Sequence, residues 1–274
     1  MKLELDGPLL LVGAGKMGGA LLDGWLARGL DPAKVVVLDP APPPEVAALL
    51  AKHGVRHVAE APNLSGPPAV MLMAVKPQVM DAVLAPIRGL AGPRTVVVSI
   101  AAGRTIASFE KHFAPGTAVI RTMPNTPAAI GRGITVCTGN SSVGARERAM
   151  CEALLAAVGE VGWVEDEGLI DAVTAVSGSG PAYVFLMVEA MAAAGVKAGL
   201  DPALSMRLAR ATVAGSGELL HRSDLAAATL RQNVTSPGGT TAAALGVLMA
   251  PDGLEALMTR AVEAAARRGR ELAG

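Results

Sequence analysis

Two glycine-rich turns carry most of the residues that could do chemistry. The first is GAGKMG, Gly13 to Gly18, which follows the apolar run Leu9 to Val12 and precedes a helical pattern. The second is SPGGTT, Ser236 to Thr241, which also feeds a helical stretch. A helix that begins at such a turn presents unpaired N–H groups to an anion. We therefore expect both turns to be anion sites.

The glycine spacing of the first turn matches a dinucleotide site. Gly13 allows the tight turn, Gly15 lets the backbone approach a pyrophosphate, and Gly18 lets helix and strand pack closely. The preceding strand and the following helix favour this reading over an incidental glycine turn. The residues expected to contact the cofactor are Gly13, Ala14, Gly15, Lys16, Met17 and Gly18.

Asp39 follows the second apolar run of the chain, at the position where an acidic residue binds the adenosine ribose in dinucleotide sites. A carboxylate there accepts hydrogen bonds from the ribose hydroxyls and repels a 2′-phosphate. No arginine follows within Pro40 to Pro44, so these residues favour NADH. The alternative is that Asp39 only caps the turn before Pro40.

A further polar segment, MAVKPQ, follows a later apolar strand. The carboxyl end of such a strand faces the cofactor in this kind of sheet. Lys76 could reach a phosphate or the nicotinamide ribose, or it could be a solvated lysine at a helix start. The cofactor contacts expected in this segment are Ala74, Val75, Lys76 and Pro77.

The elements that must position these residues fall into two parts. In the first part, short apolar strands alternate with helical segments, and strands that are apolar along their whole length indicate a parallel sheet covered by helices. In the second part, strand patterns stop and long helices rich in Ala and Leu follow. We therefore predict an α/β Rossmann-type dinucleotide-binding domain over residues 1–167 and an all-α C-terminal domain over residues 168–274. The expected strands are Leu9 to Val12, Lys34 to Leu38, Ala69 to Val75, Arg94 to Ile100, Thr117 to Thr122, Ile134 to Cys137 and Glu160 to Val164.

Composition argues against several classes of protein. The 274 residues include 24 basic and 24 acidic side chains and no run of Lys and Arg, so no nucleic-acid surface is expected. Cys137 and Cys151 belong to no metal-binding motif, so we expect two reduced, partly buried thiols and no metal.

The most apolar later stretch, Ala172 to Val188, is interrupted by Gly178, Gly180 and Pro181. A buried helix pair explains it better than a membrane span. The apolar N-terminal run is short and leads into the glycine turn, so it is not expected to be a signal peptide. The expected compartment is the cytoplasm, without membrane association.

Three further segments complete a family pattern. They are RTMPNTPAAIGRGIT at 121–135, SGSGPAYVF at 177–185 and VTSPGGTTAAAL at 234–245. Together with GAGKMG and MAVKPQ, they resemble pyrroline-5-carboxylate reductase over nearly the whole chain, and the VTSPGGTT segment is the most specific of them. The resemblance implies reduction of 1-pyrroline-5-carboxylate to L-proline with NADPH or NADH, the last step of proline biosynthesis.

The resemblance also assigns roles to residues. It implies that Ser236, Gly239, Thr240 and Thr241 bind the substrate carboxylate, that Thr241 lies beside the ring nitrogen as the catalytic residue, and that Asn125 contacts the cofactor. The residues themselves agree, because glycines let the backbone come close to a carboxylate and hydroxyls donate to it. The alternative is a capped helix turn with no ligand.

The C-terminal part offers few other catalytic groups. A protonated imine is already electrophilic, so hydride transfer demands no strong general base. Lys197 is expected to be a surface lysine at a helix C-terminus before Gly199. Asp224 could contact the imine nitrogen through water, although the surrounding HRSDLAAA departs from the family's commoner Glu-containing stretch.

Two other functions remain open on this architecture. A 3-hydroxyacid dehydrogenase of the 6-phosphogluconate type would need a catalytic lysine followed by Asn, whereas Lys197 is followed by Ala-Gly-Leu. A non-catalytic dinucleotide-binding scaffold would not need the SPGGTT turn. The apolar C-terminal helices favour burial against a second copy, and the resemblance implies a homodimer or a larger homo-oligomer built from dimers.

Overall fold

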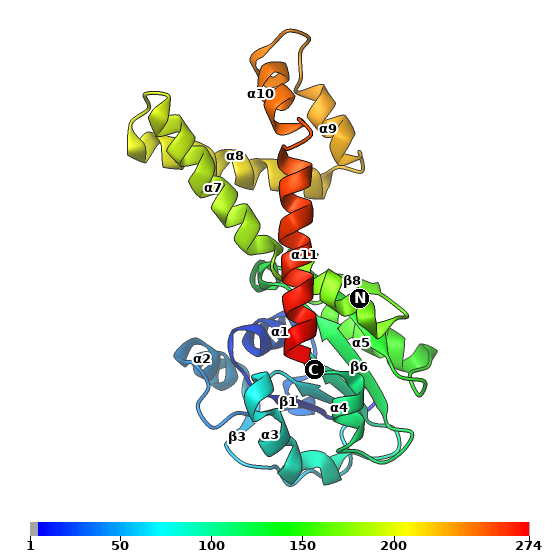
Figure 1. Cartoon of the computed structure of the whole chain (residues 1–274). Coiled ribbons are helices and arrows are strands. Elements are labelled where there is room, and N and C mark those ends of the chain that lie inside the picture. The colour runs from blue at the N-terminus through cyan, green and yellow to red at the C-terminus, as the bar shows by residue number, and fades with distance from the viewer. Residues whose placement is uncertain (1–4, 274) are drawn as a thin grey trace. The chain divides into compact units, whose positions relative to one another are not determined.

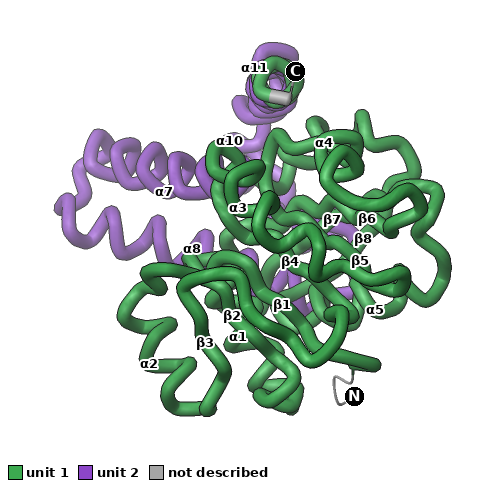
Figure 2. The backbone as a smooth tube through the Cα atoms, turned by 90° about the horizontal axis from the view of Figure 1, so that it is seen from below, with its two compact units in different colours: residues 1–178, 266–274 green, residues 179–265 purple. Residues whose placement is uncertain are grey.

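The computed structural model describes residues 5–273 and divides the chain into two compact units (Figures 1 and 2). Unit 1 comprises residues 1–178 with 266–274, and unit 2 comprises residues 179–265. The division predicted at 167/168 thus lies eleven residues before this junction (178 against 167), and the end of the last helix belongs to unit 1.

Unit 1 is built on one sheet with the strand order β3-β2-β1-β4-β5-β6-β7-β8. Each expected strand is present, β1 (Leu9–Val12) with the predicted ends and the others with shifted ends: β2 (Val35–Leu38), β4 (Val70–Met73), β5 (Val96–Ser99), β6 (Ala118–Met123), β7 (Gly133–Gly139) and β8 (Gly159–Trp163). The strand β3 (Arg56–Val58) was not predicted, because its arginine and histidine are exposed at the sheet edge. Every residue of β1, β2, β4 and β5 is buried, as expected for a sheet covered on both faces.

The sheet is parallel from β1 to β6, but β7 runs antiparallel to β6. The sheet is therefore parallel as predicted, except at this one pair. A parallel connection needs a crossover of about a dozen residues or more, whereas only residues 124–132 join these strands. The longer connection through α5 (Ala145–Leu155) makes β7 and β8 parallel again.

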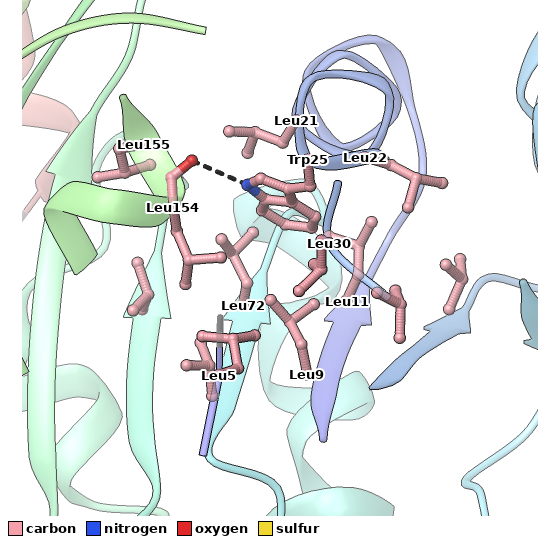
Figure 3. Packing of buried hydrophobic residues seen from close by; sticks show 14 of the residues in the cluster. Leu5, Leu9, Leu11, Leu21, Leu22, Trp25, Leu30, Leu72, Leu154 and Leu155 are labelled. Carbon is pink, nitrogen blue, oxygen red and sulfur yellow. Dashed lines mark hydrogen bonds between the residues drawn. The ribbon is translucent and has the colours of Figure 1, made fainter. Parts of the chain in front are cut away.

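Alternate residues of the strands point into two separate cores. Leu9 and Leu11 belong to one core with α1 (Lys16–Ala27), α2 (Pro44–His53) and α5, whereas Leu10 and Val12 belong to the other with α3 (Met80–Ile87) and α4 (Ile106–Glu110). Trp25 fills the first core, and its indole N–H donates to the carbonyl of Leu154 at 2.8 Å (Figure 3). This packing fixes α1, and hence the glycine turn, against β1.

The connection toward unit 2 contains α6 (Ile170–Val173) and a π-helical turn, Thr174–Gly178. Unit 2 then holds α7 (Gly180–Lys197), α8 (Pro202–Arg222), α9 (Ala227–Asn233), α10 (Thr240–Leu248) and most of α11 (Leu254–Ala273). Asp201 caps α8 by accepting from the amides of Ala203 and Leu204 at 3.0 and 3.1 Å. The α7 and α8 helices pack closely at Gly195, where an added Cβ would overlap the Ser205 hydroxyl.

The expectation of a buried helix pair is wrong for the chain taken alone. Ala192 is the one buried residue of α7, and Phe185, Leu186 and other apolar side chains of this helix are exposed. By length and composition alone, the helical segment Glu167–Lys197 could also cross a membrane, a test that helices of soluble proteins pass as well. Periodicity shows that a helix has an apolar face, but it does not show whether that face is covered by the same chain.

Candidate functional site

The glycine turn after β1 has the geometry expected of a dinucleotide site. Gly13 has φ +92°, and a Cβ there would lie 2.8 Å from Cγ1 of Val75. A Cβ on Gly18 would overlap the carbonyl oxygen of Gly13. In contrast, a Cβ on Gly15 would meet no atom within 4 Å, so this glycine borders open space. Two of the glycines therefore shape the turn, while the third leaves room for a ligand.

The N-terminus of α1 is suited to an anion. Its N-cap is Gly15, which has no side chain to occupy the first amides, and no acidic residue lies in the first turn. Lys16 is exposed at the first helical position and adds positive charge. These features fit the pyrophosphate of a dinucleotide, because free N–H groups and the helix dipole both favour an anion.

Asp39 connects this turn to the end of β2. One carboxylate oxygen accepts from the amide of Ala14 at 2.7 Å, and the other accepts from the amide of Ala41 at 2.9 Å. The bond from Ala41 caps the turn at Pro40, as the alternative interpretation of Asp39 predicted. The bond from Ala14 also connects Asp39 to the glycine turn. A carboxylate has about four acceptor positions, so two remain for ribose hydroxyls.

A cavity of about 650 Å³ lies beyond the carboxyl ends of β1, β2 and β4. This is the crevice where α/β folds of this strand order bind dinucleotides. The expected residues Gly13, Asp39 and Val75 line it. The remaining wall residues are Val12, Leu38 and Pro40 at strand ends, and Ala59, Glu60, Ala61, Val79, Ala82, Val83 and Pro86 from the loop after β3 and from α3 with the residue before it. No sequence pattern indicated that this loop and helix line the cavity.

The other cofactor candidates in unit 1 lie at strand ends. Ala74 extends β4, donating its amide to the carbonyl of Val12 at 2.7 Å. Lys76 is exposed and precedes the 3-10 turn that begins at Pro77. Asn125 follows β6, and its side-chain oxygen accepts from the amide of Ile134 at 2.9 Å. Asn125 therefore stabilises the start of β7, a structural role that no sequence pattern indicated.

The SPGGTT turn of unit 2 forms a second uncapped helix start. Gly238 has φ +69°, and the Gly239 amide donates to the carbonyl of Ser236 at 3.1 Å. Gly239 is the N-cap of α10, with no side-chain cap and no acid in the first turn. Thr240 and Thr241 are the first two helical residues, whose amides have no acceptor within a helix. The alternative of a helix turn closed by its own side chain does not describe this geometry.

The chain itself covers this second site sparsely. Ser236 and Thr240 are exposed and Thr241 is half-buried, and neither α9 nor α10 contains a buried residue. Asp224 lies exposed in the loop between α8 and α9. Lys197 ends α7, and Gly199 follows with φ +99°, as expected for a helix C-terminus.

The two buried thiols belong to neither site. Cys137 and Cys151 are unpaired as disulfides and buried between β7 and α5. They are buried more completely than the sequence indicated. In the part of the chain that the structure describes, no cluster of His, Cys, Asp and Glu could hold a metal ion.

Known families match both parts of the chain. A family described as NADP oxidoreductase, coenzyme F420-dependent, matches residues 9–103, and a family described as pyrroline-5-carboxylate reductase dimerisation matches residues 167–272. The second match covers the helices whose apolar side chains are exposed, so the chain carries a dimerisation domain.

Curated proteins and solved structures agree over the full length. Pyrroline-5-carboxylate reductase of Pseudomonas aeruginosa is 39% identical over 97% of this chain and 96% of its own length, and that of Synechocystis is 48% identical over 78% and 77%. The solved reductase of Coxiella burnetii is 31% identical with a TM-score of 0.91, covering 98% of this chain and all of the other. The Plasmodium falciparum reductase, solved with NADP bound, is 28% identical with a TM-score of 0.79, covering 98% and 99%. With both motifs in place and relatives matched end to end, this chain belongs to the pyrroline-5-carboxylate reductase family of oxidoreductases.

Proposed function

We propose that this chain reduces 1-pyrroline-5-carboxylate to L-proline, with the SPGGTT turn holding the substrate carboxylate and the Gly13–Gly18 turn holding NADPH or NADH. The observation that carries the proposal is the uncapped start of α10, where Gly239 leaves the amides of Thr240 and Thr241 without helical acceptors. The other helix start, at Gly15, belongs to the turn whose Gly13 lines the cavity at the strand ends, and it suits the cofactor pyrophosphate.

The residues of the α10 turn would bind and orient the substrate. Backbone amides of Thr240 and Thr241 and the hydroxyls of Ser236 and Thr241 are donors, and a carboxylate accepts such bonds strongly. The positive end of the helix dipole adds to the attraction. Gly239 keeps the approach to the backbone free of a side chain.

The chemistry needs little acid–base help from the chain. When bound, the reduced nicotinamide supplies a hydride to the carbon of the C=N bond. The chain's task is to orient the protonated imine and to keep its carboxylate fixed during the transfer. We assign Thr241, the second residue of α10, to the ring nitrogen, as the resemblance of the SPGGTT turn to the family motif implies.

The proposal is tested by the turnover of Thr241 variants with 1-pyrroline-5-carboxylate. Loss of one hydrogen bond should lower kcat/KM about tenfold in Thr241→Ala, and Thr241→Ser should recover most of it. Thr259→Ala is the matched control, because the Thr259 hydroxyl bonds within its own helix to the carbonyl of Glu255 at 2.9 Å. Wild-type kcat/KM in Thr241→Ala would contradict the role.

We further propose that the working form is a homodimer, or a larger assembly built from dimers, in the cytoplasm. The exposed apolar side chains of α7, α8 and α11 support association, since patches of this kind rarely face water in a monomer. Light scattering of the purified protein would test this, and a concentration-independent monomer would contradict it.

A further inference from the structure

The cofactor cavity contains a second carboxylate that the sequence pattern did not reveal. Glu60 lines the cavity from the loop after β3, and Asp39 lines it from the end of β2. They are the two charged residues in the lining, both acidic, and the remaining wall residues are apolar or glycine. The cavity therefore offers a phosphate no cationic partner.

The strand pairing holds the two acids at neighbouring strand ends. Leu38 and Val58 are register partners in the parallel pair β2 and β3, and the Asp39 amide donates to the Val58 carbonyl at 3.0 Å. Asp39 directly follows Leu38, the last residue of β2. Glu60 comes two residues after Val58, the last residue of β3. Both carboxylates thus belong to the same corner of the cavity.

The two acids differ in their other contacts. Asp39 holds the glycine turn through the amide of Ala14, so its replacement would disturb the turn as well as the charge. Within residues 5–273, the exposed Glu60 side chain has no hydrogen bond or ion pair. Arg56, at the start of β3, does not line the cavity, and its guanidinium donates to the carbonyl of Asn63 at 3.1 Å.

We propose that Glu60 is a specificity-determining residue, which acts with Asp39 to exclude the 2′-phosphate of NADPH and makes the chain prefer NADH. The inference rests on the proposed function only in placing the adenosine half of the cofactor in this cavity. A phosphate monoester carries about 1.5 to 2 negative charges at neutral pH. It would meet two carboxylates there, whereas the ribose hydroxyls of NADH can donate to Asp39.

The test uses cofactor fragments that lack the nicotinamide, so it is independent of turnover. Calorimetric titration of the full chain with ADP-ribose and with its 2′-phosphorylated form should show the unphosphorylated ligand binding about tenfold tighter or more at low salt. Glu60→Gln should tighten the phosphorylated ligand several-fold and leave ADP-ribose unchanged. Glu160→Gln, which removes the same charge from β8 at the opposite edge of the sheet, should leave both affinities at wild-type values.

Each other result would overturn the inference. If Glu60→Gln left the ratio of the two affinities unchanged, Glu60 would have no part in the preference, and the proposed reduction would still stand. If the wild type bound the phosphorylated ligand better, the acids would face away from the ribose. If neither fragment bound, the adenosine half would lie outside this cavity, and the dinucleotide site itself would be refuted.

Discussion

Replacing Gly15 with alanine should weaken cofactor binding while leaving the fold nearly intact. The new methyl group would meet no protein atom within 4 Å, and Gly15 has φ −65°, which alanine adopts freely. Alanine is a poorer N-cap than glycine, so the free energy of unfolding should fall by only about 0.5–1 kcal/mol. The methyl group would, however, occupy the space through which a pyrophosphate reaches the amides of α1.

The loss of binding can be worked from one contact. A hydrogen bond to a charged group contributes about 1.5–3 kcal/mol. Losing one would raise the Kd for NADH by roughly tenfold to a hundredfold. Fluorescence titration with NADH measures the Kd, and thermal unfolding should show a shift of a few degrees, about 2–4 °C.

Gly66→Ala is the matched control for this variant. Gly66 also has no atom within 4 Å of an added Cβ, but it lies in the loop between β3 and β4 and not at a helix start, so NADH binding should be unchanged. Wild-type affinity for NADH in Gly15→Ala would refute the placement of the pyrophosphate at this turn. A large loss of stability would instead refute the view that Gly15 serves the ligand rather than the fold.

Three further results are expected from unit 1. Trp25→Phe removes the donor to the buried Leu154 carbonyl and should cost about 1–3 kcal/mol in urea unfolding; an unchanged midpoint would contradict this. The hydrogen bond of the Cys151 thiol to Cys137 and its burial raise the pKa of Cys151, and both thiols are buried. Iodoacetamide should therefore label neither cysteine at neutral pH until urea unfolds the chain, and rapid labelling of the native protein would contradict this. Hydrogen bonds from Arg104 and His112 lower the pKa of Asp81 below its ordinary value of 3.8, so its contribution to stability is present above that pH and lost as pH falls through the lower folded value. The Tm curves of wild type and Asp81→Asn should differ at neutral pH and converge below pH 3.8, and a constant gap would exclude the linkage.

Sequence patterns identified the elements whose residues share one environment along their length. The strands β1, β2, β4 and β5 are apolar throughout because both faces are covered, and this needs no knowledge of the partner elements. The edge strand β3 was missed because Arg56 and His57 face solvent. The reversal between β6 and β7 depends on the length of a connection rather than on composition.

The residues of the candidate sites also divide into those that the sequence predicted and those that it missed. Gly13 and Gly18 were predicted because a positive φ and a close backbone contact require glycine at a fixed spacing, whereas Gly239 was predicted from the resemblance of its turn to a family motif. Glu60 was missed because it lies in a loop with no periodicity, and only the pairing of β2 with β3 brings it to Asp39. The apolar residues of α7 predicted a buried helix, and those of the C-terminal helices together favoured burial against a second copy. A sequence pattern does not show which residues of one helix are covered by the same chain and which by a second copy.

The most direct test of the account is oxidation of NADH and NADPH by the purified protein with 1-pyrroline-5-carboxylate, followed by absorbance, with proline identified as the product. The account predicts turnover to proline, with a higher kcat/KM for NADH than for NADPH. No turnover with either cofactor, from folded protein that still binds the dinucleotide, would contradict the assignment of the substrate to the SPGGTT turn.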